Sequence, residues 1–272
     1  MTPLLPAQTL SGVDRIHHAD ALRLLRSLPT GSIDLIVTSP PYDNLRTYNG
    51  YTFPFEAIAH ESYRVLKQGG VLVWVVGDET IDGSETFTSL RQAVYFHDAV
   101  GFNAHDTMIY EAAGTGAKGS NYSYWQAFEY MFVFSKGRPK TVNRIADVQN
   151  KTIGLIRSGR WRDNGKTERP HATKEYGVRS NIWRYNVGFM DNSDKTGHPA
   201  PYPEALAQDH ILSWSNEGDT VLDYFGGSGT TAKMARNNGR RWITGDISGE
   251  YVELMRKRLA QPYTLPMFAA SA

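Results

Sequence analysis

Cysteine is absent from the 272 residues of this chain. Without it there can be no disulfide framework, no thiolate metal site and no mechanism with a cysteine nucleophile. Long apolar runs are also missing, because the longest, at 70–77, is far shorter than the roughly 20 residues of a membrane-spanning helix. The first residues lack the pattern of a signal peptide, so we expect a cytoplasmic protein, and no spacing of histidines or carboxylates suggests a metal.

An excess of one charge is missing from the whole chain but not from its parts. The chain carries 29 Lys and Arg against 28 Asp and Glu, a net charge of +1. Residues 136–195 alone carry 14 basic against 6 acidic residues, a local charge of +8, which leaves −7 for the remainder. Neutralisation of phosphates supplies most non-specific affinity for nucleic acid, so this basic stretch predicts a nucleic-acid contact. A solvated surface segment is the alternative.

The order of apolar segments predicts an α/β fold. Strands are expected at 16–20, 33–37, 71–76, 103–110, 128–134, 220–223 and 241–246, and helices at 21–28, 55–66, 89–100, 203–215, 230–238 and 249–259. Continuously apolar strands that alternate with helices indicate a mostly parallel sheet covered on both faces. The 40% apolar content is enough for one large domain with an insertion.

A stiff segment, Thr38-Ser39-Pro40-Pro41-Tyr42, follows the second expected strand. Two adjacent prolines restrict the backbone, so little orientation is lost on binding. The Ser39 hydroxyl and the Pro40 carbonyl can accept hydrogen bonds, and the Tyr42 ring can stack. The segment therefore predicts a site that holds a flat ring bearing an amino group.

A glycine-rich turn lies where the strand at 220–223 is expected to lead into the helix at 230–238. Glycines let a ligand approach the backbone, and a helix N-terminus offers unpaired N–H groups. Asp246 lies about 20 residues further on, at the end of the next strand, where an acid can bond both ribose hydroxyls of an adenosine ligand. The alternative is a tight strand–helix turn with an incidental acid.

The segment at Ser39 resembles motif IV of the DNA amino-methyltransferases, in which Asp/Asn/Ser-Pro-Pro-Tyr/Phe holds the target base. Other stretches similar to landmarks of this family are 20–22, 63–70, 198–203 and 239–246. The base-binding motif precedes the cofactor motif, with the basic stretch between them, an order similar to the β class. The resemblance implies a Rossmann-like, mostly parallel seven-stranded sheet with an inserted recognition region, and S-adenosylmethionine as the methyl donor.

The resemblance also implies three parts and a set of site residues. Residues 1–135 would form the catalytic half with the base-binding motif, 136–197 the target-recognition region and 198–272 the cofactor-binding half. The catalytic residues would be Ser39, Pro40, Pro41 and Tyr42. The cofactor-binding residues would be Asp20, Ala21, Ser39, His198, Pro199, Asp223, Phe225, Gly226, Gly227, Ser228, Gly229, Thr230 and Asp246, with Asp20 at the adenine, Asp246 at the ribose and the turn at the methionine end.

The target base follows less directly from the motif. Ser39 stands where adenine enzymes of the family often carry Asp, and Ser is more familiar in cytosine-N4 enzymes. Adenine modification is the commoner activity in the β-class order, so we favour adenine N6 over cytosine N4 by a narrow margin. The target atom is hidden in a duplex, so the base must be flipped out. The missing cysteine agrees with attack by an amino group, because methylation of the cytosine ring carbon would need that nucleophile.

Basic and aromatic residues of the recognition region are the candidates for contact with double-stranded DNA. They are Arg157, Arg160, Trp161, Arg162, Lys166, Arg179, Trp183 and Arg184. Arginine can bond guanine with two hydrogen bonds, whereas lysine mostly neutralises phosphate. A homodimer and a cognate restriction enzyme are further partners to consider. The other classes left open are an RNA or small-molecule methyltransferase, a dehydrogenase and a catalytically silent DNA-binding protein.

Overall fold

The computed structural model describes residues 12–41, 53–113, 124, 126–157, 171–186 and 203–262. The chain forms two compact units. The main unit comprises Met1–Asn143 with Ile182–Ala272, and the smaller unit comprises Arg144–Asn181. No helix among the described residues is long and apolar enough to cross a membrane.

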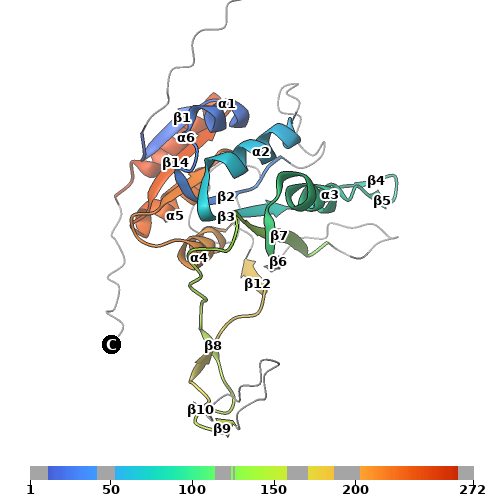
Figure 1. Ribbon diagram of the computed structural model, residues 1–272, viewed down its shortest axis with the longest axis vertical. Helices are drawn as coiled ribbons and strands as arrows, with labels where there is room; N and C mark the ends of the chain where they lie inside the picture. The colour runs from blue at the N-terminus through green and yellow to red at the C-terminus, as the bar shows by residue number, and fades with distance from the viewer. Residues whose placement is uncertain are drawn as a thin grey trace, which may run out of the picture. The chain divides into compact units, whose positions relative to one another are not determined.

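An eight-stranded sheet forms the centre of the main unit, in the order β1-β14-β13-β2-β3-β7-β6-β12 (Figure 1). The strands are β1 (Arg15–His18), β2 (Ile33–Thr38), β3 (Leu66–Val76), β6 (Asn103–Ala113), β7 (Phe128–Ser135), β12 (Ile182–Asn186), β13 (Thr220–Asp223) and β14 (Arg241–Asp246). Only β7 runs antiparallel to its neighbours, β3 and β6. The predicted fold class is confirmed, with one strand more than the seven expected, because β12 adds to the edge parallel to β6.

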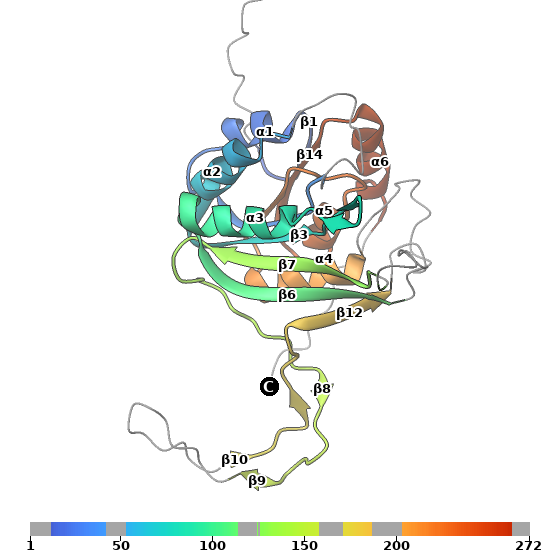
Figure 2. The same cartoon turned by 90° about the vertical axis from the view of Figure 1, so that its right-hand side faces the viewer.

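Helices cover both faces of this sheet (Figure 2). One face carries α1 (Ala21–Ser27), α2 (Phe55–Val65) and α3 (Thr88–Tyr95), which continues into the π-helix η1 (Phe96–Val100). The other carries α4 (Glu204–Trp214), α5 (Thr230–Asn237) and α6 (Gly249–Leu259). A short hairpin, β4 (Thr80–Ile81) with β5 (Ser84–Glu85), precedes α3.

Aromatic rings fill the core between the sheet and the face with α2 and η1. Trp74 of β3 and Phe96 of η1 are fully buried, with ring centroids 5.1 Å apart. Phe96 also packs against Phe102 at 5.6 Å and against Phe134 of β7 at 5.0 Å. The contacts of Phe96 with Trp74 and Phe102 are edge-on, and such contacts add to the free energy gained by burial. The cluster packs β3 and β7 against η1.

The smaller unit is a two-stranded antiparallel ribbon. β8 (Val148–Gln149) pairs with β11 (Tyr176–Gly177), and β9 (Ile156–Arg157) pairs with β10 (His171–Ala172). None of its residues with a described side chain is buried, and Ile156 is 70% exposed. The described residues of this unit therefore form no core of their own. A lone two-stranded ribbon is only marginally stable in water.

Candidate active site

The two segments singled out in the sequence lie side by side at the carboxyl edge of the sheet. β2 ends at Thr38, directly before Ser39, and its neighbour β13 ends at Asp223, directly before the glycine-rich turn. The Thr38 hydroxyl donates a buried hydrogen bond of 2.7 Å to Asp223 Oδ1 across 185 positions of sequence. In parallel sheets, ligands bind outside the carboxyl ends of the strands, so this edge is the candidate site.

Asp223 joins the two segments. Its side chain is 2% exposed, and Oδ1 accepts from the Phe225 N–H at 3.1 Å as well as from Thr38. Burial raises the pKa of Asp223 to about 6, although these hydrogen bonds favour the carboxylate. Thr38 was not among the predicted site residues, and no feature of the sequence other than its place before Ser39 indicated this bond.

The glycines of the turn meet two different structural requirements, a positive φ and close packing against β14. Gly229 N–H donates to Gly226 O at 2.7 Å and closes the turn, with Gly227 and Gly229 at φ +49° and +80°. Positive φ favours glycine at these two positions. A Cβ on Gly226 would lie 2.3 Å from Thr244 Oγ1, so this residue must be glycine to pack against β14.

Asp246 lies beside the turn, at the end of β14. Oδ2 accepts from Gly227 N–H at 3.0 Å, and Oδ1 accepts from Ser248 N–H at 2.8 Å. Burial raises the pKa of this carboxyl, which is 7% exposed. At the next strand along, Asp20 follows the end of β1 and caps α1 by accepting from Arg23 N–H at 2.9 Å, directly before the buried Ala21. The acidic groups at 20, 223 and 246 thus lie at or directly after the ends of three strands, on one edge of the sheet.

Aromatic contacts fix the turn against α2. The Tyr224 hydroxyl and Ser62 Oγ are 2.8 Å apart and buried. The Phe225 ring meets the Phe53 ring edge-on at 5.7 Å and the Trp74 ring at 6.4 Å. The residues after Asp223 are therefore held on the side of α2 as well as on the side of β14.

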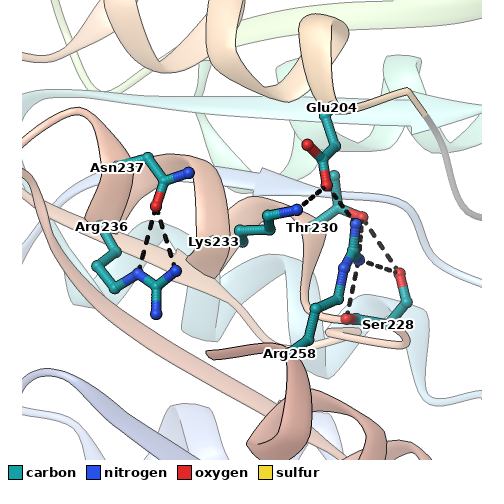
Figure 3. A network of polar contacts seen from close by, with 7 residues as sticks. All are labelled: Glu204, Ser228, Thr230, Lys233, Arg236, Asn237 and Arg258. Atoms are coloured by element: carbon teal, nitrogen blue, oxygen red, sulfur yellow. Dashed lines mark hydrogen bonds and ion pairs between the residues drawn. The ribbon is translucent and has the colours of Figure 1, made fainter. Parts of the chain in front are cut away.

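A buried arginine reaches the turn from α6 (Figure 3). Arg258 Nη1 donates to Ser228 O, Ser228 Oγ and Thr230 Oγ1 at 3.0, 2.9 and 3.0 Å. Arg258 Nη2 donates to Glu204, which also accepts from Lys233 at 2.7 Å. Neither Glu204 nor Arg258 was predicted, because an arginine in a basic helix end looks like a surface residue in the sequence.

Several predicted site residues lie outside the described part of the chain. They are Tyr42, Arg160, Trp161, Arg162, Lys166, His198 and Pro199, and only the backbone of Arg157 is described. In the smaller unit, Arg179 forms a two-bond ion pair with Asp147, which lowers the pKa of that carboxyl. Ser39 and Pro41 are half-buried and Pro40 is buried.

The remaining DNA-contact candidates, Trp183 and Arg184, belong to β12 of the main sheet. Trp183 is 7% exposed, and its ring lies 4.8 Å from the ring of His210 on α4. A packing role accounts for this tryptophan. Arg184 is exposed and lies 3.6 Å from Glu111 of β6. Among the described residues, no cluster of three or more His, Cys, Asp or Glu could hold a metal ion.

A family model described as DNA methylase, which covers N6 and N4 methyltransferases, matches residues 33–257. The chain belongs to this family. The methylase is 55% identical over 237 residues to the orphan methyltransferase M.BamHII of Bacillus amyloliquefaciens, a match that covers 84% of this chain and 89% of the relative. It is 30% identical over 254 residues to the DNA adenine methyltransferase YhdJ of Escherichia coli (strain K12), a match that covers 90% and 82%.

Solved structures of methyltransferases share the fold. The PvuII DNA methyltransferase (cytosine-N4-specific) matches with a TM-score of 0.68 at 21% identity, over 92% of this chain and 87% of that one. M1.HpyAVI in its SAM complex matches with a TM-score of 0.62 at 22% identity, over 91% and 99%. The predicted class is confirmed: the chain is a DNA amino-methyltransferase with S-adenosylmethionine as its cofactor.

Proposed function

We propose that this methylase modifies a specific DNA sequence, by methyl transfer to the exocyclic amino group of a base that is flipped out of the duplex. The hydrogen bond between Thr38 and Asp223 carries the proposal, because it joins the end of the base-binding strand to the start of the cofactor turn. A methyl donor at the turn and a base at Ser39 would then meet at one sheet edge. Transfer between them needs no covalent link to the protein.

Ser39 and Pro40 would activate the amino group. The lone pair of an exocyclic amine is delocalised into the ring, so the nitrogen is a poor nucleophile. The Ser39 hydroxyl and the Pro40 carbonyl would accept the two amino hydrogens and draw that pair back onto nitrogen. Pro41 stiffens the loop, and Tyr42 would stack on the ring, which offsets part of the few kcal/mol that flipping costs.

The cofactor residues fit an adenosine-containing ligand. S-adenosylmethionine, when bound, supplies an electrophilic methyl group on its sulfonium. Each Asp246 oxygen holds one backbone N–H, and a carboxylate has further acceptor positions for two ribose hydroxyls. We assign Asp20 to the adenine, the backbone of the turn at Phe225–Gly229 to the methionine end, and His198 and Pro199 to the wall of the same site.

Adenine N6 is the proposed target, and cytosine N4 is the second candidate. The Escherichia coli relative, at 30% identity, is named a DNA adenine methyltransferase. Ser39 favours cytosine, since serine in this position is more familiar in cytosine-N4 enzymes. The likeness to the cytosine-specific PvuII enzyme, at 21% identity, extends only to the fold.

The smaller unit is the proposed main contact with DNA. It lies wholly within the recognition region predicted at 136–197, and it carries nine Lys and Arg against four Asp and Glu, a net charge of +5. Its apolar side chains are exposed, as in Val148, Ile156 and Tyr176. A two-stranded ribbon of this kind can enter a major groove and contact base edges. We assign Arg157, Arg160, Trp161, Arg162, Lys166 and Arg179 to this contact, together with Arg184 of β12.

Two further partners remain part of the proposal. We propose that the methylase acts in the cytoplasm. Its candidate protein partners are a second copy of this chain and a restriction enzyme that cuts the same sequence. The Bacillus amyloliquefaciens relative is named an orphan methyltransferase, which favours action without a restriction partner.

Analysis of methylated DNA tests the function directly. DNA from cells that express the chain is digested to nucleosides, and mass spectrometry separates N6-methyladenine from N4-methylcytosine. Modification-sensitive sequencing of the same DNA gives the recognised site. We expect N6-methyladenine at one short sequence. N4-methylcytosine would reverse the choice of base, and no methylated base in DNA, with methyl transfer to RNA instead, would refute the function.

A further inference from the structure

Arg258 is a buried charge whose partners come from the cofactor turn and from α4. Its side chain is 5% exposed, and its guanidinium makes three hydrogen bonds to Ser228 and Thr230 and one ion pair with Glu204 (Figure 3). A buried charge is costly unless it is paired and hydrogen-bonded. The guanidinium of Arg258 meets both conditions, because Glu204 supplies the opposite charge and the turn supplies neutral acceptors.

The acceptors that Arg258 holds lie in the turn, at Ser228, and at the first residue of α5, Thr230. Ser228 and Thr230 are each 3% exposed, and their hydroxyl oxygens are 3.1 Å apart while both accept from Arg258 Nη1. These hydroxyls are engaged inside the protein. The turn can therefore offer a ligand mainly its backbone, and Arg258 holds that backbone directly through the Ser228 carbonyl oxygen at 3.0 Å.

The shape of the guanidinium suits this task. Arginine presents donors in a rigid, planar fork, whereas a lysine ammonium is a single point on a flexible stem. Nη1 of the Arg258 fork donates to Ser228 and Thr230, and Nη2 donates to Glu204 at the start of α4. Lys233 of α5 shares Glu204 at 2.7 Å. The carboxylate thus fixes the direction of the fork from the side away from the turn.

We propose that Arg258, held by Glu204, is a positioning residue for the methyl donor: through Ser228 and the adjoining Thr230 it sets the backbone geometry of the Phe225–Gly229 turn, and thereby the affinity for S-adenosylmethionine. The inference rests on the proposed assignment of this turn to the cofactor. Arg258 acts through the turn and does not itself touch the substrate.

Calorimetric titration of S-adenosylmethionine into the full chain tests the inference. Arg258→Met should raise Kd by about 30-fold and Arg258→Lys by about 10-fold, as expected when hydrogen bonds to a charged group are removed. Thr230→Val, which keeps the shape but removes one acceptor, should raise Kd by about threefold. At saturating cofactor and DNA, kcat of the two Arg258 variants should change by less than about threefold, because the turn regains its geometry once the site is filled.

Two arginines of the same region serve as matched controls. Arg236 of α5 is half-buried and bonds Leu259 O and Asn237. Arg256 of α6 is exposed and lies 3.3 Å from Glu253. Arg236→Met should lower the melting temperature and leave Kd within about twofold, and Arg256→Met should leave both unchanged.

The outcomes separate the inference from the proposed function. A wild-type Kd in folded Arg258→Lys and Thr230→Val, or an equal rise in Arg236→Met, would overturn the positioning role. If Arg258→Met does not fold, the Arg258→Lys and Thr230→Val measurements decide. The variant Asp246→Ala distinguishes a failure of the Arg258 inference from a failure of the proposed cofactor site. A raised Kd in Asp246→Ala with no change in the Arg258 variants rejects this inference alone, whereas no change in either set rejects the assignment of the turn to the cofactor.

Discussion

Asp223 combines a position at the candidate site with an unfavourable environment for its charge. Burial raises its pKa from the usual 3.8 to about 6, although hydrogen bonds from Thr38, Thr231 and the Phe225 N–H each lower it. The folded protein therefore binds this proton more tightly than the unfolded chain does. The contribution of Asp223 to stability is full below the unfolded pKa, and it disappears as the pH rises through the folded pKa, between about pH 4 and pH 6.

The variant Asp223→Asn should remove this pH dependence. Asparagine Oδ1 can still accept from Thr38 and from Phe225 N–H, but it carries no ionisable group. The free energy of unfolding of the variant, relative to that of the wild type, should rise by up to about 3 kcal/mol between pH 4 and pH 7. Urea denaturation at several pH values measures it. A constant difference across the range would contradict the raised pKa, and Glu253→Gln on the exposed face of α6 is the control.

Ser39→Ala should lower the turnover number much more than the affinity for the cofactor. The change removes an acceptor for the amino hydrogens of the base, so we expect kcat to fall about 100-fold, as when one stabilising partner of a transition state is removed. Transfer of a tritiated methyl group at saturating DNA and cofactor gives kcat, and calorimetry gives the Kd for the cofactor, which should change much less than kcat. Ser32→Ala, whose hydroxyl donates to Pro29 O at the opposite end of β2, should keep full activity. Full activity in Ser39→Ala would remove this residue from the mechanism.

For single residues, the sequence indicates which side chains have the chemistry of the site, but it does not indicate which residues they contact. Ser39, Asp223 and Asp246 could be picked out because their residue types follow strand ends in a recognisable order, and the structure gathers them on one edge. The bond from Thr38 to Asp223 and the arginine behind the turn depend on which strands and helices become neighbours. No local pattern carries that information, because the partners are 185 and 30 positions apart.

At the scale of elements, the close approach of the turn to β14 and α6 depends on one missing methyl group. A Cβ at Gly226 would lie 2.3 Å from Thr244 Oγ1 and 2.9 Å from Met255 Sδ. We expect Gly226→Ala to destabilise the protein by about 1–3 kcal/mol and to weaken cofactor binding, because the turn must move away from β14. Thermal unfolding and calorimetry measure the two effects.

A second-site change tests the cause of that effect. Thr244→Ala removes the clashing oxygen, so the double variant Gly226→Ala/Thr244→Ala should recover part of the stability that Gly226→Ala removes. Gly249→Ala is the control, because its Cβ would meet nothing closer than His18 at 3.5 Å and should be tolerated. Equal stability of Gly226→Ala and Gly249→Ala would show that packing does not require the glycine.

Most helices and strands could be predicted from the sequence, and the exceptions depend on contacts with other parts of the fold. The strand at 220–223 and the helix at 249–259 were expected at the bounds observed, because apolar period and end signals agree there. β12 was missed as a strand of the main sheet, since its five residues alternate without an apolar run and only pairing with β6 defines it. The helix expected at 89–100 changes to a π-helix at Phe96, a deviation that the packing of this buried ring accompanies.

At the scale of the whole molecule, the positive charge is concentrated in the smaller unit. We expect Lys151→Ala and Lys174→Ala, both in the smaller unit, to weaken binding to any duplex. The slope of log K against log salt should become shallower by about 0.9 for each phosphate that is no longer neutralised. Fluorescence anisotropy at several salt concentrations measures the slope. Lys257→Ala in α6 is the control. An unchanged slope in both ribbon variants would place the DNA contact elsewhere.

The order of the strands has a consequence for synthesis of the chain. β1 and β2 follow each other in sequence but are not paired, because β14 and β13 lie between them. A nascent chain that has emerged only as far as residue 219 would therefore have a gap two strands wide between β1 and β2, and the Thr38 hydroxyl would lack its acceptor, Asp223. Premature termination before residue 220 should then yield fragments that cannot close this gap and that lack the turn at Phe225–Gly229.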